Sequence, residues 1–313
     1  MRKNKVEGVK PFNDLFFKSC YDHQLLAGIA SFGIDKDALL LNTFTNIEEE
    51  FEVGEVELLN EKKLEKLLGY KKIHCNVNKR KLIKCIDKGQ PIIMGIDAFY
   101  LEMRTDVYQI EHVAHFTLVY GYDLDKSETN VIDHRYLNSF DYKEEIVSLD
   151  NLLLSNKMFR KGTLNRRLSC YILKRKRNVE MVNPWYYIDE KLISNNQEKS
   201  LKNLKSLRNI ASGDLAVAQN NVKKIIDYLK TLKTFYNILA KTQLFVDMHE
   251  HQEDAKSLVS AYSNILSLFW KIDAQKNYNL LEKYSTAILR KLDEIQSLEK
   301  RLYEFLLEAR KEL

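Results

Sequence analysis

The stretch between residues 111 and 136 holds the side chains best suited to acid–base chemistry. His115 precedes the run Phe116–Tyr120, whose β-branched and aromatic residues are typical of a strand. A polar turn follows, and the short apolar run Val131-Ile132 then leads to Asp133. Antiparallel strands joined by a turn can place the first residue of one beside the last residue of the other, so His115 and Asp133 are expected to meet. Such a pair supplies the base and the orienting carboxylate of a nucleophilic site.

The candidate nucleophile, Cys20, lies far upstream. It precedes apolar residues at helical spacing, which predicts a helix over roughly residues 19–32 with Ser19 or Asp14 as its cap. A cysteine in a first helical turn feels the positive end of the helix, which stabilises the thiolate and lowers the thiol pKa. An imidazolium at His115 would lower that pKa further. An inert buried thiol is the alternative, because cysteine is often buried.

Other residues compete for the roles of base and orienting partner. His112 lies three residues before His115, which is favoured because it adjoins the predicted strand and the Gly-Tyr-Asp turn. Asp123 and Asn138 are the alternatives to Asp133. The expected catalytic residues, in chain order, are Cys20, His115 and Asp133.

Three further side chains are candidates for tuning the thiol or contacting substrate. His23 lies three residues after Cys20, on nearly the same helix face, where it would either tune the thiol or pack structurally. Asp97 and Tyr100 would either line an acyl or acceptor pocket or form a hydrogen bond at the end of the sheet. The other cysteines lie in apolar or helical settings and are expected in the core: Cys75, Cys85 and Cys170.

The composition is that of a globular protein with a small positive charge. Of 313 residues, 45% are hydrophobic and 30% charged, and the formal net charge is +5. No apolar run approaches the length that spans a membrane, and the first residues lack the apolar core of a signal peptide. We therefore expect a cytoplasmic protein with reduced cysteines, whose spacing gives no reason to expect a metal site.

Two segments are strongly basic. Residues 71–88 contain seven basic side chains and one acidic one, and residues 157–177 contain nine basic side chains and no acidic one. Such runs are most often solvated surface, but they also suit docking of an acidic partner. Nucleic acid is not expected, because neither run carries a known nucleic-acid motif.

The chain is expected to divide near residue 180. Residues 1–180 predict helices followed by a mainly antiparallel sheet, an α+β domain in which the apolar run Ile92–Asp97 is a central strand. Residues 181–313 predict about four helices, because apolar residues recur every three or four positions and residues 185–313 contain no proline and one glycine. An antiparallel bundle is favoured, and a dimerisation arm that would make a homodimer is the alternative.

With these residues placed, the first half of the chain resembles a known family. Residues from about 10 to 175 are similar to the N-terminal domain of butirosin biosynthesis protein H, a family of papain-like acyltransferases, and more distantly to bacteriocin-processing peptidases. The resemblance rests on Cys20 at a helix start, on Gln90–Asp97 with Phe99-Tyr100-Leu101, and on His115 through Gly121-Tyr122-Asp123 to Ile132-Asp133. The helical tail is not part of it.

The resemblance implies a papain-like fold and acyl transfer. Cys20 would take an acyl group from the phosphopantetheine thioester of an acidic carrier protein and pass it to an amine of a natural product, with His115 as base and Asp133 as its orienting partner. No cofactor bound by the protein itself is implied. Papain-like enzymes usually hold a glutamine about six residues before the cysteine, where this chain has Asp14, and an ionised aspartate cannot donate a hydrogen bond. The oxyanion would then be bound by the Cys20 backbone N–H and a second donor such as Asn13.

Two other functional classes remain open at this point. The same three residues could serve a cysteine peptidase, amidase or thioesterase with water as the acceptor. Alternatively, the first domain could be a catalytically dead scaffold, with the helical part of the chain binding a partner.

Overall fold

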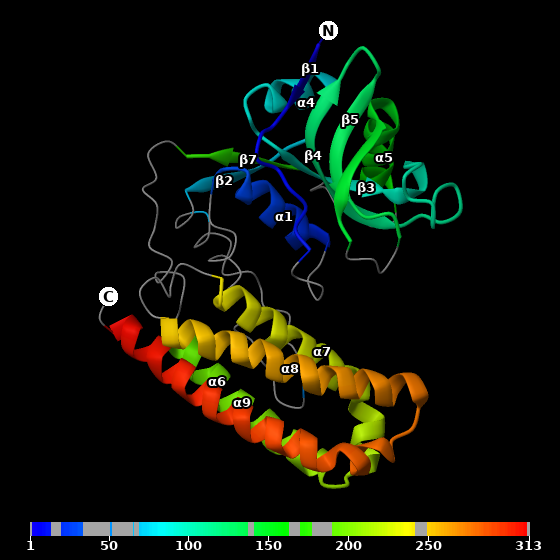
Figure 1. Ribbon diagram of the computed structural model, residues 1–313. Coiled ribbons are helices and arrows are strands. Elements are labelled where there is room, and N and C mark those ends of the chain that lie inside the picture. Colours follow the sequence, from blue (N-terminus) through cyan, green and yellow to red (C-terminus); the bar gives the residue numbers. More distant parts are fainter. Residues whose placement is uncertain are drawn as a thin grey trace. The chain divides into compact units, whose positions relative to one another are not determined.

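The computed structural model describes residues 2–13, 20–33, 51, 65, 69–136, 141–162, 170–176, 190–241 and 249–311. The chain divides into two compact units. The first comprises Met1–Lys36 and Asn60–Val182, and the second Asp37–Leu59 and Asn183–Leu313. The first unit contains a sheet and helices and the second contains helices (Figure 1), which confirms the predicted α+β fold with a helical C-terminal region. No helix in the described part of the chain is long and apolar enough to cross a membrane.

The described strands of the first unit form one antiparallel sheet. The strand order is β2-β7-β3-β4-β5-β6, and β1 pairs with β4. Their bounds are β1 Lys3–Lys5, β2 Tyr70–His74, β3 Ile92–Asp97, β4 Ala114–Asp123, β5 Glu128–Asp133, β6 Lys143–Ser148 and β7 Cys170–Arg175.

The strand at Ile92–Asp97 is central, as its sequence predicts. All six residues of β3 are buried, and the strand lies between β7 and β4. The next strand, β4, is longer than predicted. Its pairing with β5 shifts register between Val119 and Gly121, and this irregularity lets the strand continue to Asp123 instead of ending at Tyr120.

Three strands were not predicted, and each has a physical reason. The polar first residues contain β1, which pairs with β4. The charged segments at Tyr70–His74 and Lys143–Ser148 form β2 and β6, which end the sheet on its two sides. An edge strand exposes many of its side chains, so its sequence lacks the apolar pattern by which a strand is recognised.

Helix α1, Cys20–Ala30, packs against the sheet and begins at the candidate nucleophile. Its Gly28 permits this close packing, because a Cβ there would lie 2.3 Å from Cδ1 of Leu173 in β7. Two further helices of this unit are α4, Lys79–Ile86, and α5, Leu149–Lys161, which is capped by the Ser148 side chain. The predicted caps Ser19 and Asp14 lie outside the described residues, as does Asn138.

The second unit contains four long helices that run side by side (Figure 1). Their bounds are α6 Glu190–Ala211, α7 Leu215–Leu239, α8 His249–Gln275 and α9 Leu280–Lys311. Helix α8 packs on α7 and on α9, and α9 packs on α6.

Candidate functional site

The thiol of Cys20 lies at the start of α1, beside the start of β4. It is half-buried, and it lies close enough to the His115 side chain and to the backbone N–H of Phe116 for both to lower its pKa. The helix thus brings a cysteine from the beginning of the chain to a strand almost a hundred residues later. The contact is between a sulfur atom and an imidazole, the geometry by which a base activates a thiol.

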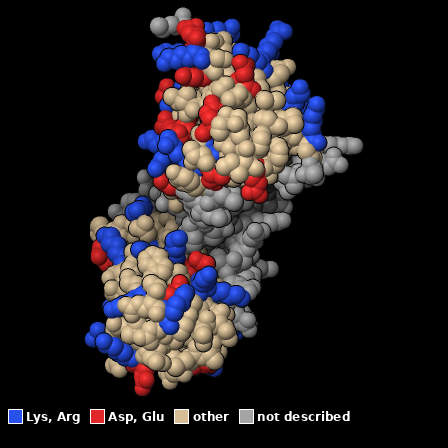
Figure 2. Space-filling model, turned by 90° about the vertical axis from the view of Figure 1, so that its right-hand side faces the viewer, with Lys and Arg blue, Asp and Glu red and all other residues tan. Residues whose placement is uncertain are grey.

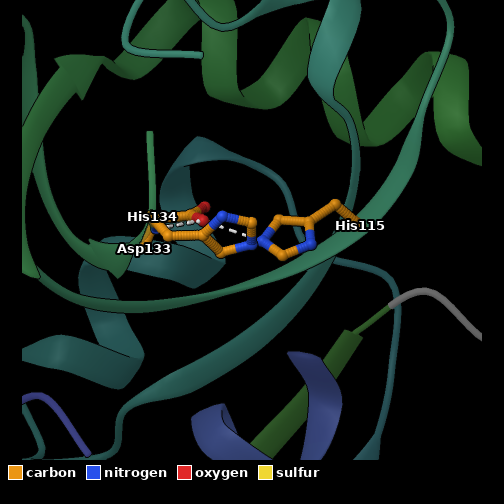
Figure 3. A group of neighbouring side chains, drawn as sticks. All are labelled: His115, Asp133 and His134. Atoms are coloured by element: carbon orange, nitrogen blue, oxygen red, sulfur yellow. Dashed lines mark hydrogen bonds and ion pairs between the residues drawn. The ribbon is translucent and has the colours of Figure 1, made fainter. Parts of the chain in front are cut away.

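The imidazole of His115 connects this thiol to a buried carboxylate. Its Nε2 lies 2.7 Å from Oδ1 of Asp133, and both side chains are buried. The two residues project from neighbouring antiparallel strands, β4 and β5, and point toward each other in Figure 3. Because Asp133 occupies Nε2, the ring nitrogen that remains for the Cys20 sulfur is Nδ1.

The charges of these groups are strongly coupled. Burial raises the pKa of Cys20, but the hydrogen bond and positive charge of His115 and the N–H of Phe116 outweigh it, and the net pKa is lowered. Burial lowers the pKa of His115, yet the negative charge and hydrogen bond of Asp133, helped by Cys20, raise it to about 9. Although burial alone would raise it, the pKa of Asp133 is lowered by the same imidazolium. The three groups therefore stabilise one another in their charged forms, thiolate, imidazolium and carboxylate.

His134 and Tyr142 enclose this group, and neither was singled out in the sequence. The backbone N–H of His134 donates to Oδ1 of Asp133 at 2.7 Å, and its ring Nδ1 donates to the Tyr136 carbonyl at 2.6 Å. The ring stands perpendicular to that of His115, with centroids 4.7 Å apart. Burial and the positive charge of His115 lower the pKa of His134 to about 4, so it stays neutral beside an imidazolium.

Tyr142 packs between His134 and His23, at centroid distances of 4.9 and 4.5 Å. Burial and then the negative charge of Cys20 raise its pKa, which indicates that the phenol lies near the thiolate. The positive charge of the fully buried Arg104 also acts on this region. It contributes to the lowered pKa of His134 and opposes the rise in the pKa of Tyr142. A pair of hydrogen bonds of 3.2 Å holds Arg104 to Asp106.

The same residues include the one metal-type grouping found in the described part of the chain. His115, Asp133 and His134 each offer a ligand atom, and these atoms lie within 4.8 Å of one another. A metal ion would have to replace the hydrogen bond between His115 and Asp133 and the protons of both rings. The contact with Cys20 is explained by an imidazolium on its own, so the geometry fits proton transfer better than metal binding.

Two of the predicted auxiliary residues hold the surroundings of the thiol in place. The side-chain amide of Asn13 binds the backbone of Tyr142 twice, donating to its carbonyl at 3.1 Å and accepting from its N–H at 2.8 Å. Nδ1 of His23 donates to the Phe12 carbonyl at 2.8 Å, and the ring is buried against Tyr142. These contacts favour a structural role for both residues.

The other two, Asp97 and Tyr100, lie in a separate cluster with His112. Oδ2 of Asp97 is 2.7 Å from Nδ1 of His112, and its Oδ1 accepts from the N–H of Phe99. The ring of His112 stacks on Phe99 at 4.3 Å, and Tyr100 lies beside both. No hydrogen bond or ring contact described here joins this cluster to Cys20, His115 or Asp133. His112, with a side chain 64% exposed, therefore has a carboxylate partner of its own.

Sequence reasoning overlooked His134, Tyr142 and Arg104. The Asp-His dipeptide at 133–134 was a usable signal, because a residue that follows a proposed catalytic carboxylate in the sequence necessarily lies near the site. No comparable signal marks Tyr142, which directly precedes β6, or Arg104, which lies in the loop before β4.

Comparison with known proteins gives one family. No curated protein matches the chain. A family model matches residues 57–134, a segment that contains α4, β3, β4 and β5 with His115 and Asp133, while Cys20 lies before it. The description of that family is Butirosin biosynthesis protein H, N-terminal. The resemblance predicted from the sequence is thereby confirmed over residues 57–134, where this chain is similar to the N-terminal region of butirosin biosynthesis protein H.

Proposed function

We propose that the protein is a papain-like acyltransferase that carries an acyl group on Cys20 from a thioester donor to an amine. The observation that carries this proposal is the grouping of Cys20, His115 and Asp133, in which the imidazole binds the carboxylate and lowers the pKa of the thiol. The family match supports the reaction class. A grouping of this kind is suited to nucleophilic acyl transfer.

In the first half-reaction, the Cys20 thiolate attacks the carbonyl carbon of the donor thioester. The new carbon–sulfur bond forms as the carbonyl π electrons move to oxygen, and the oxyanion then collapses and expels the donor thiolate. Nδ1–H of His115 protonates that leaving sulfur. The products are acyl-Cys20, the free donor thiol and neutral His115, so atoms and charges balance.

In the second half-reaction, His115 changes from acid to base. The thiolate charge of Cys20 is among the causes that raise the pKa of His115, and acylation removes that charge. The imidazole of the acyl-enzyme is therefore a better match for taking a proton from an attacking amine. The amine nitrogen bonds to the acyl carbon, His115 receives the amine proton, and Cys20 leaves as the thiolate.

The oxyanion needs donors close to Cys20. The first residues of an α-helix have backbone N–H groups without an intrahelical partner, and Cys20 is the first residue of α1. Its own N–H is therefore the first donor in this proposal, aided by the positive end of the helix. Asn13 is a weaker candidate for the second donor, because its amide already binds Tyr142.

The donor is proposed to be an acidic carrier protein bearing a phosphopantetheine arm. The two basic runs meet in the sheet, since β2 and β7 pair with Lys71 opposite Lys174 and Tyr70 opposite Arg175. Like charges directly opposite each other on neighbouring strands are unfavourable unless an anion lies near them. On the face that Figure 2 shows, by contrast, acidic and basic side chains lie interspersed.

Side-chain contacts connect this basic edge to Tyr21, the residue after Cys20. Nζ of Lys72 in β2 donates to the hydroxyl of Tyr21 at 2.8 Å. The same ammonium lies over the rings of Tyr21 and Tyr171, at 5.3 and 4.8 Å from their centroids. A carrier docked on β2 and β7 would thus present its arm next to Cys20.

The proposal is tested by looking for the covalent intermediate. The full chain is mixed with acyl-pantetheine thioesters, free or on a carrier protein, and its intact mass is recorded with and without an amine. We expect a mass increase by the acyl group in the wild type and its loss when amine is added. The Cys20→Ala variant should show no adduct.

Cys75→Ala is the matched control, because Cys75 is also half-buried and lies in the same unit. It should behave like the wild type. An adduct that persists in Cys20→Ala, or a Cys20 that iodoacetamide alkylates no faster than Cys75 near neutral pH, would refute acyl transfer by Cys20. An acyl-enzyme that reacts with water as fast as with amines would instead establish a hydrolase.

A further inference from the structure

The core of the helical unit contains a buried carboxylate, Glu299 of α9. Its side chain is 3% exposed and accepts three hydrogen bonds, one from each of the other helices. The hydroxyls of Tyr236 in α7 and Tyr262 in α8 both donate to Oε1 at 2.6 Å, and Ser200 in α6 donates to Oε2 at 2.7 Å. All four helices of the bundle therefore converge on one carboxylate.

This carboxylate has no cationic partner among the described residues. The basic residues that follow it directly along α9 are engaged elsewhere: Arg301 binds Asp254, and the ammonium of Lys300 lies 3.9 Å from Glu304 in a side chain 69% exposed. Burial raises the pKa of Glu299, although its three hydrogen bonds oppose the shift. A buried carboxylate without a cation is costly, so such sites either take up a proton or bind a positive group.

One acceptor position of Glu299 remains available. A carboxylate offers about four positions for hydrogen bonds, two on each oxygen. Tyr236 and Tyr262 occupy Oε1, and Ser200 takes one position on Oε2. The remaining position on Oε2 can hold either a proton or a donor supplied by a ligand.

Glu299 also lines a pocket that has room for such a ligand. The pocket has a volume of about 190 Å³. An engineered cavity of about 150 Å³ in another protein accommodates benzene, so a small organic molecule fits. The residues that line it come from α6 and α9, and most of the surface that they present to it is apolar: Gln197, Leu201, Gln296, Glu299, Lys300 and Tyr303.

We propose that this pocket binds a small organic ammonium ion, with Glu299 as its counter-ion. The ammonium would donate to the open position of Oε2, the amides of Gln197 and Gln296 can bind further polar groups of the ligand, and Tyr303 offers an aromatic wall of the kind that attracts cations. An anion is disfavoured beside Glu299, and a lone carboxylate among hydroxyls is a poor site for a divalent metal ion. This site does not depend on the chemistry of Cys20.

The experiment compares ligands that differ in charge but little in shape. Binding of cyclohexylammonium, its neutral analogue cyclohexanol and the anion cyclohexanecarboxylate to the full chain is measured by calorimetry near pH 8, in an amine-free buffer. The Cys20→Ala background keeps thiol chemistry out of the measurement. We expect the ammonium ion to bind at least tenfold more tightly than either analogue.

Two variants locate the binding site. Glu299→Gln keeps the shape and should weaken ammonium binding at least tenfold, while Glu308→Gln, an exposed carboxylate on the same helix, should leave it unchanged. Leu201→Trp fills the pocket from a side chain that is already 43% exposed, and should block binding without altering the network around Glu299.

The proton balance gives an independent readout. If Glu299 is protonated in the free protein, ammonium binding releases that proton, which appears as a heat that depends on the buffer. The phenols that face Glu299 come from α7, α8 and α9, namely Tyr228, Tyr236, Tyr262 and Tyr303, and burial raises their pKa values, so they do not titrate near neutral pH. The other charged group of the pocket lining is Lys300, whose ammonium lies 3.9 Å from Glu304. Equal affinity for ammonium and alcohol, unchanged ammonium binding in Glu299→Gln or Leu201→Trp, or no binding of the ammonium would each overturn the proposal.

Discussion

Each unit of the chain contains a deeply buried carboxylate, and the pKa values of these two carboxylates are shifted in opposite directions. Asp133 in the sheet and Glu299 in the bundle are 0% and 3% exposed. The pKa of Asp133 is lowered despite its burial, through the charge and hydrogen bond of His115, whereas burial raises the pKa of Glu299. Burial is similar at the two sites and Glu299 accepts the larger number of hydrogen bonds, so the charge of the partner makes the difference.

The comparison shows what a cation does that hydrogen bonds do not. Three hydroxyl donors do not offset the desolvation of Glu299, while one imidazolium and one backbone N–H offset that of Asp133. The ion pair of His115 and Asp133 is an internal solution to burying charge. In the bundle, the negative charge of Glu299 is instead neutralised by a proton or by a bound ligand, which is why we assign the two sites different kinds of function.

The largest effect is expected from removing the cation of the first unit. His115→Gln can still donate a hydrogen bond to Asp133, but it removes both the positive charge and the base. The pKa of Cys20 should rise, because His115 is the main cause that lowers it. Acyl transfer should fall by roughly 10³-fold or more, as for loss of a catalytic base in other triads.

The measurement is the rate of Cys20 alkylation and of acyl transfer as a function of pH. His112→Gln is the matched control, since His112 lies at the same 2.7 Å from a carboxylate but on the surface. It should differ little from the wild type. Equal losses in the two variants would mean that His115 has no special relation to the thiol.

A smaller effect is expected from neutralising the carboxylate while keeping its shape. Asp133→Asn should lower the pKa of His115 from about 9 toward its ordinary value, because Asp133 is the main cause that raises it. Protonation of the leaving thiol needs imidazolium, so the decline of activity on the alkaline side should move from near pH 9 to lower pH. A drop in kcat of about 10²- to 10⁴-fold is expected.

Asp97→Asn serves as its control, because that carboxylate binds His112 rather than His115. The pH profile of this variant should match the wild type. An alkaline limb that stays near pH 9 in Asp133→Asn would show that another group sets it.

The sequence was most informative where the residues that surround a given side chain in space are also close to it in the sequence. The hairpin that joins His115 to Asp133 follows from two strand patterns and a turn, and the apolar run Ile92–Asp97 predicts a buried central strand. The helical period after Pro184 likewise predicts a bundle. Each of these features depends on local pattern, which a single sequence contains.

What the sequence could not predict depends on distant partners. Lys3–Lys5 is a strand only because β4 offers an edge to it, and Tyr142 is near the thiol only through β6 and Asn13. Glu299 follows Leu298 and precedes Lys300 in a helix rich in charged residues, so nothing in its neighbourhood distinguishes it from the exposed Glu304. Only the packing of four helices makes it a buried acid.

The smallest effect concerns stability, and here the two carboxylates should have opposite pH dependence. The pKa of Glu299 is raised, so its contribution is fully favourable below its ordinary value of about 4.5 and is lost as the pH rises through the folded value. The pKa of Asp133 is lowered, so its contribution is present above about 3.8 and is lost as the pH falls. Hydrogen exchange read by peptide mass spectrometry separates the helices from the sheet and can follow both trends in one sample.

Glu299→Gln should abolish the loss of protection that the bundle helices undergo as the pH rises. Near pH 8 it should leave the bundle equally stable or stabilise it by no more than about 1–2 kcal/mol, the net worth of the hydrogen bonds it alters. The sheet should be unaffected, and Glu304→Gln should retain the wild-type trend. The buffer must contain no amine, because an ammonium ion bound at Glu299 would hide the effect. The opposite result would be a protection of the bundle that increases from pH 4.5 to pH 8 in the wild type and no longer does so in Glu299→Gln. Glu299 would then have the same pH dependence as Asp133, and the distinction between the two sites would be refuted.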